Sequence, residues 1–132
     1  MADIRFTNPE TLAKPPSYTH VVEVVGACRT IHISGQLGID LDGNVVGDFR
    51  AQAVQVFENL KAALASVGAT FADVVKINYY VRDVSHLADL RAVRDQHVST
   101  AAPPASTLVE VSHLFREDVL LEVDAVAAVG SR

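Results

Sequence analysis

The clearest structural element in the sequence is Asp48–Gly68, which reads DFRAQAVQVFENLKAALASVG. Its apolar residues recur every three or four positions, as they do on the buried face of an amphipathic helix. Asp48 precedes the repeat and can accept hydrogen bonds from free backbone N–H groups, and Gly68 follows its last apolar residue. The stretch therefore predicts one long helix with a single buried face. That face consists of Ala53, Val56, Phe57, Leu60, Leu64 and Val67.

Two short runs rich in β-branched residues come before this helix. Tyr18–Val25 and Thr30–Ser34 predict two strands that pair with each other around a turn at residues 26–29. The chain before them, to about Ser17, contains Asn-Pro and Pro-Pro and predicts irregular structure.

One more helix and three more strands are predicted after Gly68. Asp73–Asp83 alternates in the manner of a strand, and Ser85 is expected to cap a shorter helix that ends near Val98. Thr107–Val111 and Val119–Val126 predict the last two strands. The apolar face of the first of these three strands consists of Val75, Ile77, Tyr79 and Val81.

This order of elements predicts an α+β fold. If both crossovers are right-handed and share the middle strand, the two helices lie on the same face of the sheet, as in a ferredoxin-like two-layer sandwich. The strand Val119–Val126 stays apolar on both faces, so the second face also needs cover. Because no residues remain for a third layer, we expect another copy of the chain to cover it and predict a homo-oligomer.

Length and composition limit the possible domain organisation, partners and cofactors of the protein. The 132 residues, 49% of them apolar, predict a single domain over residues 1–132. A formal charge of −5 disfavours nucleic acid and anionic membranes as partners. A lone cysteine, Cys28, excludes an internal disulfide, and the five histidines lack metal-ligand spacing, so no metal is expected. The start of the sequence lacks a signal-peptide core and no stretch predicts a membrane span, so we expect a cytoplasmic protein.

Glu122 is the carboxylate best placed for chemistry. It lies inside an apolar strand, and Asp124, two residues later, is expected to share its face. An apolar surface disfavours the charged form of a carboxylate, which suits such a group to acid–base work. The alternative is that both acids lie on a solvated strand face.

Five motifs occur in order between about Asn8 and Ala128. They are Ser17–His20, Ile33–Leu37, the helix pattern of Gln52, Asn59, Leu60, Leu64 and Gly68, the strand pattern of Val74–Lys76 and Val81–Asp83, and Leu121–Ala127. At this spacing they resemble the RidA/YjgF family, the reactive intermediate deaminases. The resemblance implies a chorismate-mutase-like domain that assembles as a homotrimer, with small-molecule sites in the clefts between subunits. It also implies hydrolysis of enamines and imines, such as 2-aminoacrylate, to keto acids and ammonia without a cofactor.

The resemblance further implies roles for single residues. Glu122 matches the glutamate that positions water, Tyr18 matches a tyrosine that lines the cleft, and Gly35 matches a glycine whose backbone approaches the ligand. Ser106 stands where the family has the arginine that binds the substrate carboxylate. We add Asn78, on the polar face of its strand, as a substrate-binding candidate.

The serine at position 106 weakens the expected activity. Losing a charge-assisted bidentate contact costs on the order of 2–5 kcal/mol in binding, so deamination of 2-aminoacrylate by the usual mechanism is not expected. Three alternatives stay open: another arginine (Arg29, Arg82, Arg116 or one from a neighbouring subunit) reaches the cleft, the substrate lacks that carboxylate, or the protein binds a metabolite without catalysis. A ribonuclease or translation inhibitor, a label often attached to the family, is the weakest hypothesis because the chain is acidic.

Overall fold

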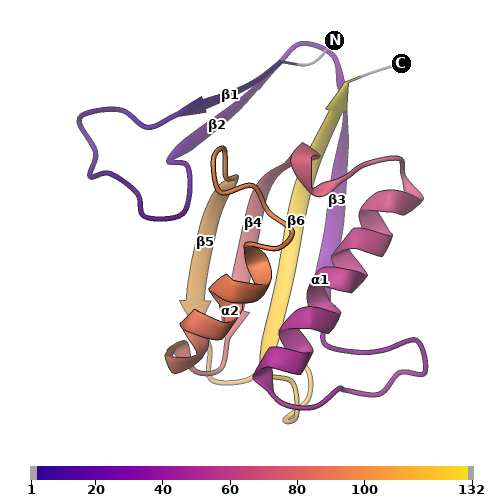
Figure 1. The fold of residues 1–132 in the computed structure, drawn as a ribbon. Coiled ribbons are helices and arrows are strands. Elements are labelled where there is room, and N and C mark those ends of the chain that lie inside the picture. The colour runs from indigo at the N-terminus through magenta and orange to yellow at the C-terminus, as the bar shows by residue number, and fades with distance from the viewer. Residues whose placement is uncertain (1–2, 131–132) are drawn as a thin grey trace.

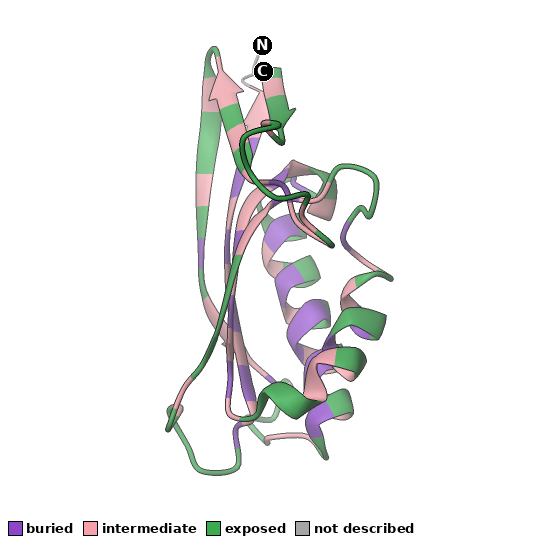
Figure 2. Ribbon diagram, turned by 90° about the vertical axis from the view of Figure 1, so that its left-hand side faces the viewer, coloured by how far each residue is buried: buried purple, intermediate pink, exposed green. Residues whose placement is uncertain are grey.

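The computed structural model describes residues 3–130, and Figure 1 shows how their strands and helices are arranged. The elements are β1 (Asp3–Thr7), β2 (Val21–Val25), β3 (Cys28–Leu37), α1 (Phe49–Ser66), the 3₁₀ turn η1 (Phe71–Asp73), β4 (Val74–Val81), the 3₁₀ turn η2 (Val84–His86), α2 (Leu87–Arg94), β5 (Ala105–Glu110) and β6 (Leu121–Gly130). Strands β3, β6, β4 and β5 form one sheet in that order, in which β4 and β5 are parallel and the other neighbours are antiparallel. Both helices lie on the same face of this sheet (Figure 2), so the expected two-layer α+β fold is confirmed.

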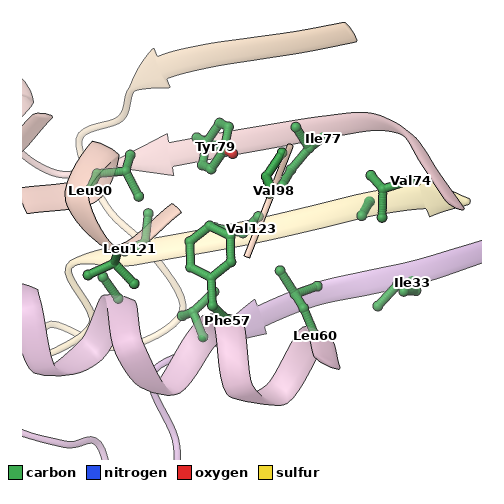
Figure 3. Close-up of a cluster of buried hydrophobic side chains, with 14 of the residues drawn as sticks. Ile33, Phe57, Leu60, Val74, Ile77, Tyr79, Leu90, Val98, Leu121 and Val123 are labelled. Carbon is green, nitrogen blue, oxygen red and sulfur yellow. The ribbon is translucent and has the colours of Figure 1, made fainter. Parts of the chain in front are cut away.

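The hydrophobic core lies between the helices and that face of the sheet. Phe57 and Leu60 of α1 lie over Ile33 of β3 and Val123 of β6, and Leu90 of α2 closes the other end (Figure 3). The helical repeat predicted for α1 is confirmed except at Val67, which follows the helix and is 39% exposed. The predicted ends are also correct, because the Asp48 carboxylate accepts a hydrogen bond from the Ala51 N–H at 3.0 Å and Gly68 has a φ of 74°.

The prediction for the second helix was wrong at both ends. The Asp83 carboxylate, rather than Ser85, provides the cap, and it accepts a hydrogen bond from the Ser85 N–H at 2.9 Å. The capped element is the 3₁₀ turn η2, after which α2 begins at Leu87 and ends at Arg94 instead of Val98.

Strand pairing near the N-terminus also differs from the prediction. Residues 3–7, expected to be irregular, form β1, which pairs antiparallel with β2 in a separate two-stranded sheet. Strand β3, expected to pair with the strand before it, pairs instead with β6. The ten residues of β3 match the ten residues of β6 in length, whereas β1 and β2 have five each. Local sequence patterns do not indicate which distant strand pairs with β3, so its pairing with β6 was not predicted.

The predicted buried face of β4 was wrong at its start. Val74 is buried and Val75 is half-buried, because the register of β4 against β6 shifts between Val74 and Lys76. After this irregularity Ile77, Tyr79 and Val81 face the core, as predicted. An irregularity of this kind inverts the in–out alternation of a strand.

The face of the sheet opposite the helices, called the open face below, carries the second set of β6 side chains. Glu122, Asp124 and Val126 are half-buried there, and they alternate with the buried Leu121, Val123 and Ala125. Within residues 3–130 no helix covers this face (Figure 2). The sheet therefore presents a mixed polar and apolar surface on that side.

Candidate functional site

Glu122 and Gly35 meet on the open face. Gly35 lies where the register of β3 against β6 shifts, between Ile33 and Gln36. A Cβ placed on Gly35 would lie 2.7 Å from Cδ of Glu122, and it would lie closer still to the carboxylate oxygen Oε2. The carboxylate therefore lies directly against the Gly35 backbone, an approach that a side chain at position 35 would block.

Asp124 organises the neighbouring part of the open face. Its Oδ1 accepts a hydrogen bond from the Asn78 side-chain amide at 2.7 Å, and its Oδ2 accepts one from the Tyr80 hydroxyl at 3.0 Å. This hydrogen bond to Asp124 raises the pKa of Tyr80, with smaller contributions from burial and from the charges of Asp124 and Glu122. The structure thus places the predicted Asn78 in a side-chain network beside Glu122, with its amide already engaged.

Two side chains of α1 fix the strand ends that carry Gly35 and Glu122. The buried Gln52 accepts a hydrogen bond from the Leu120 N–H at 2.9 Å and donates one to the Asp118 carbonyl at 2.9 Å. Asn59 donates to the carbonyls of Leu37 and Ile39 at 3.1 and 2.9 Å. The sequence singled out both residues only as part of a motif, and the structure gives them a positioning role.

Ser106 lies on the other side of the sheet. It pairs with Ile77 in the parallel ladder of β4 and β5, and paired residues share a face, so Ser106 points towards the helices. There it lines a cavity of about 200 Å³ together with Tyr18, Tyr79 and two arginines of α2, Arg91 and Arg94. Neither Gly35 nor Glu122 lines this cavity.

The predicted site residues of one chain therefore form two separate sets. Gly35, Asn78 and Glu122 lie on the open face, whereas Tyr18 and Ser106 line the cavity on the helix side. The sheet itself separates the two sets.

The arginines named from the sequence lie elsewhere. Arg29 donates a hydrogen bond to the Val67 carbonyl, Arg82 to the Glu117 carbonyl and Arg116 to the Asp118 carboxylate. None of the three lines the cavity beside Ser106, where sequence reasoning missed Arg91 and Arg94. Their i, i+3 spacing indicated that they share a helix face. It did not indicate which strand that face meets.

Two further properties of the described chain bear on function. No helix within residues 3–130 has the length and apolar character needed to span a bilayer. The same residues contain no cluster of three or more His, Cys, Asp or Glu side chains arranged to hold a metal ion.

Comparisons with known proteins agree with this architecture. The family model described as Endoribonuclease L-PSP matches residues 11–129. A Dermatophagoides farinae protein described as 2-iminobutanoate/2-iminopropanoate deaminase is 30% identical over 114 residues, or 85% of each chain.

Solved structures are similar over most of their length. YyfB from Yersinia pestis, described as a protein of unknown function of the conserved Rid family, has 34% identity and a TM-score of 0.82, covering 96% of this chain and 98% of that one. RidA from an Antarctic Psychrobacter has 36% identity and a TM-score of 0.72, covering 89% and 92%. The chain therefore belongs to the Endoribonuclease L-PSP family, the RidA/YjgF family that its motifs resemble.

Proposed function

We propose that the protein is a hydrolytic deaminase of small enamines or imines, and that its sites are completed between the subunits of a homotrimer. The observation that carries this proposal is the division of the site residues. Glu122 lies against Gly35 on the open face, while Tyr18 and Ser106 line a cavity on the opposite side of the sheet. If all four serve one ligand, as the family resemblance implies, a second copy must supply one of the two sets.

The open face supports an assembly of this kind. Val109, which pairs with Tyr80 and so shares its face, is 41% exposed, and Val126 of β6 is half-buried on the same face. A second copy that covered this face would remove that apolar surface from water.

The proposed reaction needs only water and a carboxylate. Glu122 accepts a proton from a water molecule as the water oxygen attacks the imine carbon, and the C=N electron pair moves to nitrogen, which takes that proton from Glu122 to give a carbinolamine. The resulting carbinolamine loses ammonia when its hydroxyl proton is removed and the nitrogen is protonated, which leaves a ketone. A carboxylate that lies against a strand backbone can hold the attacking water close to that backbone.

Ser106 limits the substrate. We infer that 2-aminoacrylate is a poor substrate by the usual mechanism, because a serine hydroxyl supplies one neutral hydrogen bond where a guanidinium supplies a charged pair. Imines generated from other amino acids carry the same carboxylate, so their turnover tests whether another group binds it in place of the family arginine.

The experiment generates imines in situ from several amino acids with an amino-acid oxidase and follows the loss of imine. Wild type should accelerate the loss, and Glu122→Gln should remove most of that acceleration, on the order of 10²-fold or more. Glu58→Gln is the matched control, because Glu58 lies on the exposed side of α1. No acceleration by wild type with neutral, acidic or basic side chains would contradict the deaminase proposal.

The second candidate function is binding of a small metabolite without catalysis, and Ser106 is the observation that favours it. In that case a ligand binds with equal affinity to wild type and to Glu122→Gln, and neither protein turns over an imine.

A further inference from the structure

Tyr18 lies in an irregular segment, the loop of residues 8–20 that joins β1 to β2 (Figure 1). It lines the cavity of about 200 Å³ described above and also a larger cavity of about 560 Å³, which this loop forms with Thr100, Ala101 and Pro103. Because Tyr18 borders both spaces, the orientation of its ring affects the shape of both. A loop lacks the regular backbone ladder that fixes a strand residue, so other contacts must hold Tyr18 in place.

Thr19 binds the end of this loop to the segment before β5. It is 2% exposed, its backbone N–H donates a hydrogen bond to the Pro104 carbonyl at 3.3 Å, and its hydroxyl donates one to the Pro103 carbonyl. Pro104 immediately precedes β5, the strand that carries Ser106. Thr19 therefore fixes the backbone next to Tyr18. A backbone anchor alone leaves the rotamer of the Tyr18 side chain open.

His20 contacts both the loop and the Tyr18 ring. Its Nε2 lies 2.7 Å from the Ala13 carbonyl oxygen, and because a carbonyl only accepts, Nε2 carries the hydrogen of this bond. Its backbone N–H donates to Oδ1 of Asn8 at 2.7 Å. The imidazole meets the Tyr18 ring edge to face, with the ring centroids 5.3 Å apart and the planes at 88°. This is a favourable geometry for two aromatic rings.

We propose that His20 is a positioning residue for Tyr18: its hydrogen bond to Ala13 orients the imidazole, and the imidazole holds the Tyr18 ring in its present orientation. The effect on turnover rests on the proposed deaminase function, in which Tyr18 lines the substrate site. His20 itself lines neither cavity, so it acts through Tyr18 rather than on a ligand.

The two contacts of the His20 side chain can be removed separately. His20→Gln keeps a side-chain donor for Ala13 and removes the ring, whereas His20→Phe keeps a ring beside Tyr18 and removes the donor. His20→Ala removes both contacts. His113→Ala is the matched control, because His113 is exposed and lines neither cavity.

The first experiment observes the Tyr18 ring itself and does not depend on turnover. The three tyrosines are replaced by 3-fluorotyrosine, and the fluorine NMR signal of Tyr18 is assigned with Tyr18→Phe. In His20→Ala this signal should move towards that of the free amino acid, and in His113→Ala it should stay in place. The signal of Tyr80, which lies on the open face, should stay in place in every variant. Unfolding would move the Tyr80 signal too, so the spectra separate a change at Tyr18 from a loss of folding.

The second experiment measures imine turnover by the same variants. His20→Ala should lower kcat/KM by about 10-fold, and His20→Gln and His20→Phe by about 3-fold each. The change should lie mainly in KM, because none of the His20 contacts described above involves Glu122. A smaller fraction of folded protein would instead lower kcat and leave KM unchanged. His113→Ala should match wild type in both constants.

An unmoved Tyr18 fluorine signal in His20→Ala would overturn the inference, whatever the turnover. A wild-type KM in His20→Ala, measured on a protein that turns over imines, would overturn it as well. If wild type turns over no imine, the deaminase proposal fails, and the fluorine spectra alone decide whether His20 positions Tyr18.

Discussion

Replacing Gly35 by alanine should disable the site and leave the fold intact. The new Cβ would lie 2.7 Å from Cδ of Glu122 and 3.0 Å from its Cγ. Ordinary van der Waals contact begins near 3.4 Å, so the carboxyl carbon must move by at least about 0.7 Å. The atoms that must move form the far end of a flexible side chain, and Gly35 does not have a positive φ.

The expected consequence is a loss of rate without a loss of stability. Misplacing a reacting group by about 1 Å costs up to 10²-fold, so imine turnover by Gly35→Ala should fall about 10- to 100-fold. The free energy of unfolding should stay within about 1 kcal/mol of wild type, because alanine also lowers the entropy of the unfolded chain. Turnover is followed by imine loss, and stability by urea unfolding.

Gly38→Ala provides the contrast. A Cβ at Gly38 would lie 2.7 Å from Cβ and 2.8 Å from Cα of Gln52, atoms that cannot swing away. We expect this variant to lose about 1–3 kcal/mol of stability. Wild-type turnover in Gly35→Ala would refute the claim that the present position of the Glu122 carboxylate matters. Unfolding of Gly35→Ala would refute the claim that the Glu122 side chain can move away from the new Cβ.

Three further predictions concern stability and partners. Gln52→Leu removes hydrogen bonds to Leu120 and Asp118 in a buried place and should cost about 2–4 kcal/mol in urea unfolding, and a loss below about 1 kcal/mol would contradict the positioning role. The pKa of Tyr79 and that of Tyr80 are both raised in the folded state, so the stability linked to them is full below about pH 10 and falls as the pH rises further. The urea midpoint should therefore fall more between about pH 8 and about pH 11 in wild type than in Tyr79→Phe. An equal fall in both proteins would contradict the raised pKa of Tyr79. With a formal charge of −5, the protein should show no saturable binding of single-stranded RNA at about 0.15 M salt, and binding that weakens steeply with added salt would favour the ribonuclease hypothesis.

The sequence predicted those parts of the fold that local patterns determine. The repeat in α1, its Asp48 cap and its Gly68 terminus depend on neighbours within a few residues, and they were predicted correctly. The partner of β3 depends on a strand about 90 residues later, which no local pattern reveals. The inverted phase at Val75 depends on a register shift that only the paired strand defines.

The candidate site, too, could be predicted only in part. The motifs led to Gly35 and Glu122, which the structure brings into contact, and to Tyr18 and Ser106, which share a cavity. The sequence did not show that these pairs lie on opposite sides of one sheet, because the strand order and register decide that. Nor did it show that the Tyr79 hydroxyl lacks a hydrogen-bond partner within the described residues. The alternation of apolar residues predicts that this tyrosine is buried, but it does not indicate what its hydroxyl contacts.

In the proposed trimer, Glu122 and Tyr18 serve the same site from different subunits. The most direct test mixes two inactive variants, Glu122→Gln and Tyr18→Ala, by joint unfolding and refolding, and then measures imine turnover and the mass of the assembly. In a shared site, an intact Glu122 of one subunit meets an intact Tyr18 of its neighbour at about one quarter of the sites under random assortment. We therefore expect a trimeric mass and about one quarter of wild-type turnover. Turnover no greater than that of the two variants alone would contradict it.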